Sequence, residues 1–315
     1  KASAERASAE AQRLLGELVP SVPVYSRFSV AAVSKKWRNV LSTDRITADN
    51  MWTLVMAEPR DGTTRTMTMA LAEEPRSLNP FTASSAYSWQ VLGMIYEGLI
   101  ASNPFTLEDM PGLAEEWRVE TEGEGAAAHT VLRFRLKENL RWNDGTPLTA
   151  EHFRYGLLRV VDPNVASPYA FLGFPIVNAE NFYNGKCKAE DVGIKAIDET
   201  TLERMLDYHI PLRLHHLSYH IFFPAKPEVV EAHPRDWTTS PDTILCNGPF
   251  YLTEWKHNAE MTLVKNPHYW DAENVKIDKV RVVMITDPNT ALAAFKGGKI
   301  DFTKRLPSMQ IPVLL

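Results

Sequence analysis

The spacing of apolar positions near the start of the sequence predicts a helix. Leu14, Leu15 and Leu18 fall on one side of an otherwise polar run, as in an amphipathic helix over residues 3–18. Pro20 ends this run, because the residue before a proline is driven out of helical backbone angles. The first predicted element is therefore a helix with a single apolar face.

Five further segments before residue 100 have patterns that predict local structure. Residues 22–25 and 51–56 are short apolar runs, and residues 66–71 alternate between Thr and apolar side chains, so each predicts a strand. Residues 58–62 predict a turn, since proline fixes φ and Asp-Gly tolerates positive φ. Residues 86–99 predict a helix.

The central part of the chain predicts a half-buried strand, a tight turn and a capped helix. Apolar and charged residues alternate over 131–136, as in a strand with one solvated face. The Asp-Gly pair within residues 142–147 is a hairpin-turn signal. Thr149 can cap a helix whose first turn contains Glu151. Strands and helices alternate from there onward, so the expected class is α/β or α+β.

Composition narrows the classes of function. The chain of 315 residues is 44% hydrophobic and has a net charge of −5 at pH 7. Nucleic-acid binding requires a basic face for the phosphates, so this balance argues against such a partner. No apolar run reaches the ~18 residues that a membrane-spanning helix needs. The abundant Trp, Tyr and Phe can supply both a core and aromatic contact surfaces for a ligand.

Four histidines that crowd one stretch raise the question of a metal site: His209, His215, His216 and His220. Only His216 and His220 have the i, i+4 spacing that places two ligands on one helical face. We interpret the stretch as a partly exposed polar surface. There is also no Gly-x-Ser-x-Gly elbow and no phosphate-cradling glycine loop. The sequence thus predicts no catalytic residue, no metal site, no cofactor and no enzymatic activity.

The two cysteines, Cys187 and Cys246, do not define a disulfide framework. An exported protein can pair them, but a single pair far apart in sequence is weak evidence. Cys246 has no neighbouring histidine that would make it a nucleophile. The sequence leaves open whether these cysteines are reduced.

Seven groups of short motifs stand out along the chain. They are LNPF (78–81) followed by IYEGL (95–99), FRLK (134–137) with WNDGTPLTA (142–150), DPNVASPYA (162–170), VGIKAID (192–198), NGPF (247–250), NPHYW (266–270) and GKID (298–301). In this order they resemble the motifs of family 5 extracellular solute-binding proteins of ABC importers. Residues 134–150 are similar to the most diagnostic stretch of that family, and residues 162–170 resemble its oligopeptide-binding branch.

The resemblance implies an α/β fold of the periplasmic-binding-protein type, in its type II, cluster C form. A first domain with a mixed sheet would consist of residues 1–96 and 225–305. A smaller α+β domain, residues 97–224, would be inserted within it. The family's architecture places a peptide between the first domain and a third one.

The order of the segments departs from the family's pattern. Residues 1–57 resemble the C-terminal segment of the family, which implies a circular permutation with a join at about residues 58–63. Residues 306–315 would then begin a third domain that we expect to be missing. Such a join is physically reasonable, because domain termini often lie close together. The alternative is that residues 1–57 are an unrelated leader helix and strand.

The function that the resemblance implies is capture of oligopeptides outside the cytoplasmic membrane, in the periplasm or at the cell surface, for an ABC permease. We recognise no signal peptide in the chain. Without the third domain we expect weak binding and an exposed surface that invites self-association. The alternative is an excised or engineered scaffold with no ligand-binding activity of its own.

The same resemblance names four candidate ligand-binding residues. Ser84, Ser85 and Ala86 match the stretch that pairs with the peptide backbone, and Tyr169 matches a tyrosine near the peptide. The serines can equally begin a helix as its N-cap. Tyr169 can equally be a turn residue that packs behind Pro168. The carboxylate that neutralises the peptide amine is expected in the third domain, and a buried ammonium without it is costly.

Overall fold

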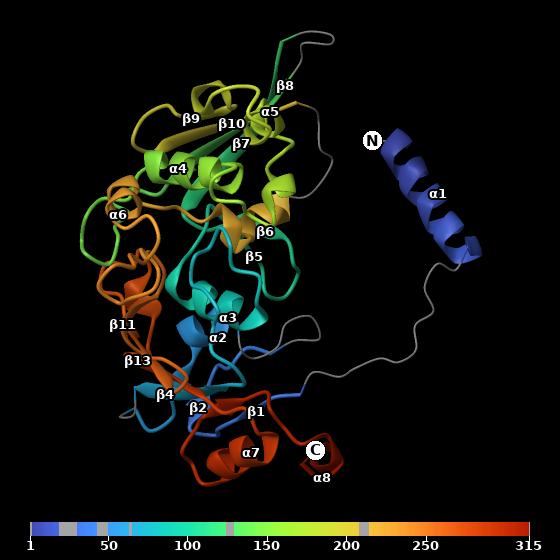
Figure 1. Ribbon diagram of the computed structural model, residues 1–315. Coiled ribbons are helices and arrows are strands. Elements are labelled where there is room, and N and C mark those ends of the chain that lie inside the picture. The colour runs from blue at the N-terminus through green and yellow to red at the C-terminus, as the bar shows by residue number, and fades with distance from the viewer. Residues whose placement is uncertain are drawn as a thin grey trace.

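The computed structural model describes residues 2–18, 30–42, 50–62, 65–123, 129–207 and 214–314. Within these ranges the chain forms two lobes, one above the other in Figure 1, each built around its own sheet. The lower lobe contains a mixed six-stranded sheet, and the upper lobe contains an antiparallel four-stranded sheet. The predicted α/β class with a mixed sheet is confirmed.

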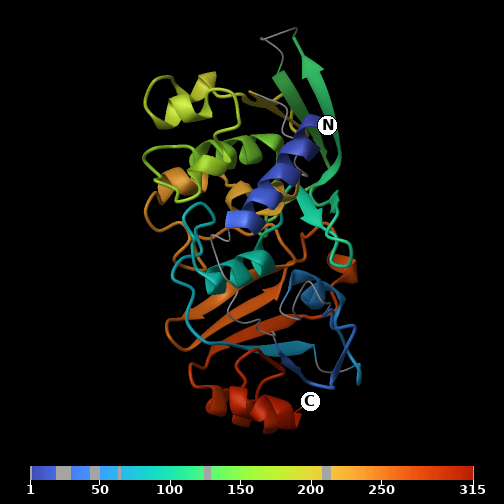
Figure 2. The same ribbon diagram turned by 90° about the vertical axis from the view of Figure 1, so that its right-hand side faces the viewer.

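The lower sheet has the strand order β1-β14-β4-β13-β12-β11. β4 runs parallel to β13 and to β14, and the other pairs are antiparallel. Helix α3 (Ala86–Ile95) lies on one side of this sheet and α7 (Pro288–Lys296) on the other (Figure 2). The strands are β1 (Ala32–Val33), β4 (Thr66–Leu71), β11 (Phe250–Lys256), β12 (Glu260–Lys265), β13 (Lys279–Met284) and β14 (Phe302–Thr303).

The upper sheet has the order β7-β8-β10-β9, and helix α4 (Ala150–Val160) packs against β9 and β10. Thr149 caps α4: its backbone N–H donates to Nδ1 of His152 over 3.0 Å, which fixes the first turn. The strands are β7 (Ala114–Glu122), β8 (His129–Leu136), β9 (Ile194–Ala196) and β10 (Thr201–Leu206).

Short elements connect the two sheets or lie at their margins. Helix α1 stands to the side of both lobes in Figure 1. Two small antiparallel ribbons pair β2 (Trp37–Arg38) with β3 (Glu58–Pro59) and β5 (Ile100–Ser102) with β6 (Asp109–Pro111). The remaining helices are α1 (Ala2–Leu18), α2 (Met51–Met56), α5 (Ala179–Tyr183), α6 (Pro227–Ala232) and α8 (Ile311–Leu314). The 3-10 helices are η2 (Ala170–Leu172), η3 (Ala189–Asp191), η4 (Leu214–Ser218), η5 (His220–Phe222), η6 (Ala272–Asn274) and η7 (Ser308–Gln310).

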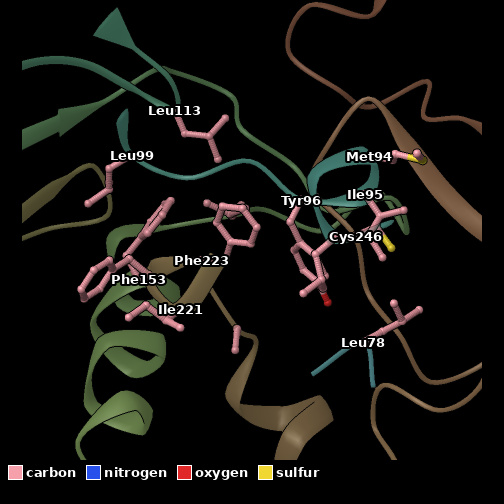
Figure 3. Packing of buried hydrophobic residues seen from close by; sticks show 14 of the residues in the cluster. Leu78, Met94, Ile95, Tyr96, Leu99, Leu113, Phe153, Ile221, Phe223 and Cys246 are labelled. Carbon is pink, nitrogen blue, oxygen red and sulfur yellow. The ribbon is translucent and has the colours of Figure 1, made fainter. Parts of the chain in front are cut away.

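One hydrophobic core runs through both lobes, and Figure 3 shows the region where they meet. The rings of Tyr96, at the end of α3, and Phe223, after η5, stack with their centroids 5.7 Å apart. Gly156 on α4 lies against the same segment, where a Cβ would collide with the carbonyl oxygen of Phe223. Because these contacts are buried and close, the lobes share packing that holds them together.

Several predicted elements are confirmed. β4 covers residues 66–71 as predicted, but Met67 to Leu71 are buried without interruption, because helices cover both faces of this sheet. β8 includes the predicted strand at 131–136. The turn at 142–147 closes through the Trp142 N–H, which donates to the carbonyl of Thr146 over 2.9 Å, and Gly145 has φ +83°.

The prediction of a strand at residues 51–56 is wrong, because this segment is helix α2. A six-residue apolar run is compatible with a strand or with a helix, and here the N-cap residue Asn50 favours the helix. The side chain of Asn50 accepts a hydrogen bond from the Thr53 N–H over 2.9 Å, and Thr53 in turn donates through its hydroxyl to the carbonyl of Leu41.

Two other boundaries differ from the prediction. The helix predicted over 86–99 ends at Ile95, because the carbonyl of Ile95 accepts from the N–H groups of Asn247 and Gly248, at 3.2 and 2.9 Å. In the turn predicted at 58–62, the first two residues pair as β3. The strand predicted at 22–25 lies outside the described residues.

The two cysteines are free and lie in different places. Cys187 is half-buried in the upper lobe near α5, and Cys246 is fully buried beside Tyr96 (Figure 3). Burial raises the pKa of the Cys246 thiol to about 12. This thiol is therefore protonated at neutral pH and acts as a small apolar core residue.

Candidate functional site

The four predicted binding residues lie on two elements that face each other across the lobes. Ser84 and Ala86 are exposed at the start of α3. Ser85 is the N-cap of α3, with extended angles (φ −97°, ψ 138°) and a side chain that accepts from the Tyr87 N–H over 3.3 Å. Ser85 therefore has the N-cap role that the sequence also allowed for these serines. Tyr169 is half-buried at the start of η2 in the upper lobe.

His220 joins these two elements. Its Nε2 lies 2.9 Å from the carbonyl oxygen of Ala83, immediately before Ser84, so Nε2 carries the proton and donates. Its ring also packs edge-on against the ring of Tyr169, with centroids 5.9 Å apart. The upper lobe thus supports the backbone next to the candidate peptide-binding segment through His220, and Tyr169 packs against the same histidine.

Trp89 completes the cluster from the second turn of α3. Its Nε1 donates to the same carbonyl of Ala83 over 3.0 Å, and its ring lies 5.6 Å from that of His220. Trp89 nevertheless remains 43% exposed, although a tryptophan is a costly side chain to leave in water. An aromatic face that is both fixed and exposed is suited to contact a ligand.

A groove of about 600 Å³ lies beside α3 in the lower lobe. Ala86 lines it, so the groove is continuous with the candidate segment. The described residues that line it are Asn50, Met51, Ala70, Leu71, Ala72, Ala86, Tyr87, Trp89, Gln90, Gly93, Phe302, Lys304 and Arg305. Most of these side chains are apolar or aromatic, as in pockets that enclose small organic ligands.

A second cavity of about 610 Å³ lies between the loop after β4 and the hairpin of β11 and β12. Glu74 lines it and accepts hydrogen bonds from Nε1 of Trp255 over 2.6 Å and from Nδ1 of His257 over 2.8 Å. This carboxylate already has two partners, and none of the four predicted residues lines the cavity. The groove beside α3 is therefore the better candidate site.

Sequence reasoning missed Trp89 and His220. His220 was considered only for metal binding, but it lies in η5 and bonds to Ala83. The side chains of His215 and His216, like residue 209, lie outside the described part of the chain. Among the described residues, no group of three or more His, Cys, Asp or Glu side chains is placed to hold a metal ion.

Glu97, in the IYEGL motif, is buried where the two lobes meet. Nε1 of Trp270 donates to its carboxylate over 2.8 Å, and the hydroxyl of Tyr269 also bonds to it. Nζ of Lys137 lies 4.3 Å from the centre of the Trp270 ring. Burial raises the pKa of the Glu97 carboxyl, and these polar contacts only partly offset the increase.

The raised pKa of Glu97 predicts a pH-dependent loss of stability. Between pH 4.5 and the folded-state pKa, the folded chain binds a proton that the unfolded chain has released, so the free energy of unfolding falls as pH rises. Glu97→Gln keeps an acceptor for Trp270 and is expected to flatten this fall. Urea unfolding at a series of pH values from acid to neutral measures it. The exposed Glu273→Gln is the control, and an equal flattening by both variants would contradict the assignment.

No helix in the described part of the chain is both long and apolar enough to cross a membrane.

Comparison with known families gives a match over most of the chain. The profile of the bacterial extracellular solute-binding proteins, family 5 Middle, matches residues 109–315. The dipeptide-binding protein DppE of Bacillus subtilis is 37% identical over 228 residues, which cover 72% of this chain and 40% of DppE. The oligopeptide-binding protein OppA of the same organism is 32% identical over 253 residues, which cover 79% and 45%.

Solved structures show the same relationship. The unliganded, open form of MppA, a periplasmic murein tripeptide-binding protein, superposes with a TM-score of 0.73 at 31% identity, over 80% of this chain and 48% of that one. Listeria monocytogenes OppA bound to peptide gives a TM-score of 0.69 at 29% identity, over 76% and 46%. The chain spans less than half the length of these relatives.

The matched region contains most of the motifs that the sequence shares with this group of binding proteins, which are not enzymes. The periplasmic-binding-protein-like fold expected from those motifs is confirmed by the superposed structures. The chain belongs to the family 5 bacterial extracellular solute-binding proteins.

Proposed function

We propose that this chain is the peptide-holding part of a substrate-binding component of a peptide ABC importer. The observation that carries the proposal is the exposed segment at Ser84 and Ala86, fixed through Ala83 by both Trp89 and His220 at the edge of an apolar groove. The relatives support it, since they are named as binding proteins for dipeptides, oligopeptides and murein tripeptide. The parent protein would act in the periplasm or at the cell surface and deliver its ligand to an ABC permease.

The proposed mode of binding uses backbone recognition with tolerant side-chain contacts. Ser85 already has strand-like backbone angles, so its exposed neighbours can pair with the main chain of an extended peptide. Trp89 and Tyr169 offer ring faces beside that segment, which accept many side chains without selecting one. Affinity would come from the peptide backbone, and specificity from the size of the groove.

Binding by this chain alone is proposed to be weak. A peptide brings a charged amine, and both charged side chains that line the groove within the described residues, Lys304 and Arg305, are cations. An ammonium enclosed without a carboxylate loses its hydration without compensation. The scaffold alternative, with no ligand binding at all, remains an outcome of the experiments below.

The domain assignment and the permutation also stay proposals. Residues 30–42 and 50–59 add to the lower lobe: β1 pairs with β14, and the Ser34 N–H donates to the carbonyl of Asp301 over 2.7 Å. Helix α2 contacts α3. These contacts support the proposal that residues 1–57 take the place of the family's C-terminal segment. They suit a leader less well, since a leader has no reason to extend the sheet of the lobe.

Removing the exposed ring of Trp89 tests the proposed site. Trp89→Ala is expected to weaken peptide binding by about tenfold, or about 1.4 kcal/mol, because exposed tryptophans at interfaces contribute strongly to affinity. Isothermal titration with a pool of short peptides measures the change. Phe105→Ala is the matched control, because Phe105 is 58% exposed and lines neither cavity. Equal effects of the two variants would place the peptide elsewhere.

A further inference from the structure

The charge of the groove beside α3 points to one class of ligand. The chain as a whole has a net charge of −5. Among the described residues that line the groove, however, the only charged side chains are Lys304 and Arg305. A cationic site in an acidic protein is a local feature that composition does not produce by itself, and it attracts anions at close range.

Arg305 is held in place without an acidic partner among the described residues. It follows β14, where its N–H donates to the Thr303 hydroxyl over 3.0 Å. Its guanidinium donates through Nη2 to the carbonyl of Thr286 over 3.2 Å, and its Nε is buried with no hydrogen-bond partner. A guanidinium has five N–H donors arranged to match a carboxylate. With Nε buried and one Nη2 donor bound to Thr286, the donors on Nη1 and the second donor on Nη2 remain for a ligand.

The first turn of α3 adds to the positive potential. Ala86 and Tyr87, its first two residues, line the same groove as Arg305. The N-terminus of a helix carries about half a positive charge, and α3 has no acidic residue in its first turn to offset it. The helix end and the two cationic side chains therefore favour negative charge in one place.

The rest of the lining limits what kind of anion fits. Met51, Leu71, Trp89 and Phe302 give the groove an apolar wall. A small hydrated anion such as phosphate gains nothing from such a wall, whereas a peptide with an apolar side chain buries it there. A ligand that combines a carboxylate with an apolar body satisfies both features.

We propose that Arg305, with Lys304 and the α3 N-terminus, binds a peptide carboxylate, so that this groove prefers peptides with an apolar residue beside a free carboxyl group. The carboxyl group is either the C-terminus or an acidic side chain. This inference rests on the proposed peptide-binding function and gives it a direction: the carboxylate lies toward β14, and the peptide backbone runs past Ser84 to Ala86.

The test compares three synthetic peptides by isothermal titration of the full chain. They are Ala-Phe-Ala with a free C-terminus, the same peptide as its C-terminal amide, and the amide of Ala-Phe-Glu. The free acid is expected to bind at least tenfold more tightly than its amide. Recovery of that affinity by the Glu-containing amide would identify a side-chain carboxylate as sufficient, and no recovery would identify the C-terminus as the ligand group.

Variants of the chain test whether Arg305 causes the preference for a free carboxyl group. Arg305→Gln is expected to remove the difference between acid and amide, Arg305→Lys to keep part of it, and Lys299→Gln, an exposed lysine outside the groove, to leave it unchanged. Circular dichroism confirms that each variant is folded. Equal binding of acid and amide by the unmodified chain would overturn this inference and leave peptide binding intact. No binding of any of the three peptides would overturn the proposed function as well.

Discussion

Gly248→Ala is expected to lower the free energy of unfolding by about 3 kcal/mol, near the upper end of the effects of overpacking a core. A Cβ at this position would lie 2.6 Å from the carbonyl carbon of Ile95, 2.7 Å from the nitrogen of Tyr96 and 2.9 Å from the oxygen of Ile95. All three are backbone atoms, so no side chain can move aside. The N–H of Gly248 also donates to Ile95, which fixes the spacing. Urea unfolding followed by circular dichroism measures the loss.

Gly93→Ala provides the control for this prediction. Gly93 lies inside α3, and a Cβ there would meet nothing within 4 Å. Alanine is favoured over glycine within a helix by about 0.5–1 kcal/mol, so this variant is expected to be slightly more stable than the original chain. A small loss for Gly248→Ala, comparable to that of an ordinary surface change, would contradict the described contact between the NGPF motif and the end of α3.

Arg204→Met is expected to raise the free energy of unfolding by about 1–4 kcal/mol, the range seen when buried charges are replaced by apolar side chains of similar size. Arg204 is 1% exposed on β10, and all three of its guanidinium nitrogens are buried without a hydrogen-bond partner among the described residues. Its guanidinium carbon lies 5.4 Å from the centre of the Phe222 ring, a cation–π contact.

The pKa of Arg204 indicates the size of the penalty. Burial lowers this pKa from 12.5 to about 10, and at about 1.4 kcal/mol per pKa unit the charged form is disfavoured by about 3 kcal/mol. The folded-state pKa remains above neutrality, so the side chain is charged and the full penalty applies at pH 7. Methionine fills a similar volume and carries no charge.

Arg133→Met is the matched control, because Arg133 lies on the neighbouring strand β8 and points its charge at carboxylates. It pairs with Glu203 over 2.8 Å and with Glu120 over 2.9 Å. Its replacement removes these pairs and leaves the largely buried Glu203 without its cation, so a loss of stability is expected. Should Arg204→Met destabilise the chain as Arg133→Met does, Arg204 would have a partner that the described contacts do not include.

The sequence predicted correctly those elements that are fixed by contacts between residues close together in the chain. The turn at residues 142–147 follows from Asp-Gly, and the start of α4 from Thr149, because the groups that fix them are a few residues apart. β8 follows from alternation, since one of its faces meets solvent. β4 was predicted for the same reason, although its burial on both faces depends on helices distant in sequence.

The errors arose where a distant contact decides the structure. Residues 51–56 are helical because Asn50 and Thr53 both bond to Leu41, on a separate segment. The helix α3 ends at Ile95 because its carbonyl is taken by the NGPF turn about 150 residues later. The Asn50 cap is itself a local signal, but the spacing of residues within either segment does not contain the bonds to Leu41 and to the NGPF turn.

The candidate site was predicted only as far as family motifs extend. They named Ser84 to Ala86 and Tyr169, whose role in binding remains a prediction. Trp89 and His220 belong to no motif that was recognised, and their place in the site follows from a meeting of two lobes at the carbonyl of Ala83. Because His220 lies near three other histidines in the sequence, its spacing does not indicate that it bonds to one specific residue on another element.

The most direct test of peptide binding by this chain is titration of the purified protein with a mixed pool of peptides of two to five residues, with circular dichroism to confirm that it is folded. We expect a saturable heat with a dissociation constant weaker than about 10 µM, because the groove contacts the peptide backbone and carboxylate but offers its amine no described carboxylate. A folded chain that gives no saturable heat with any peptide would contradict peptide binding and favour a scaffold without binding activity of its own.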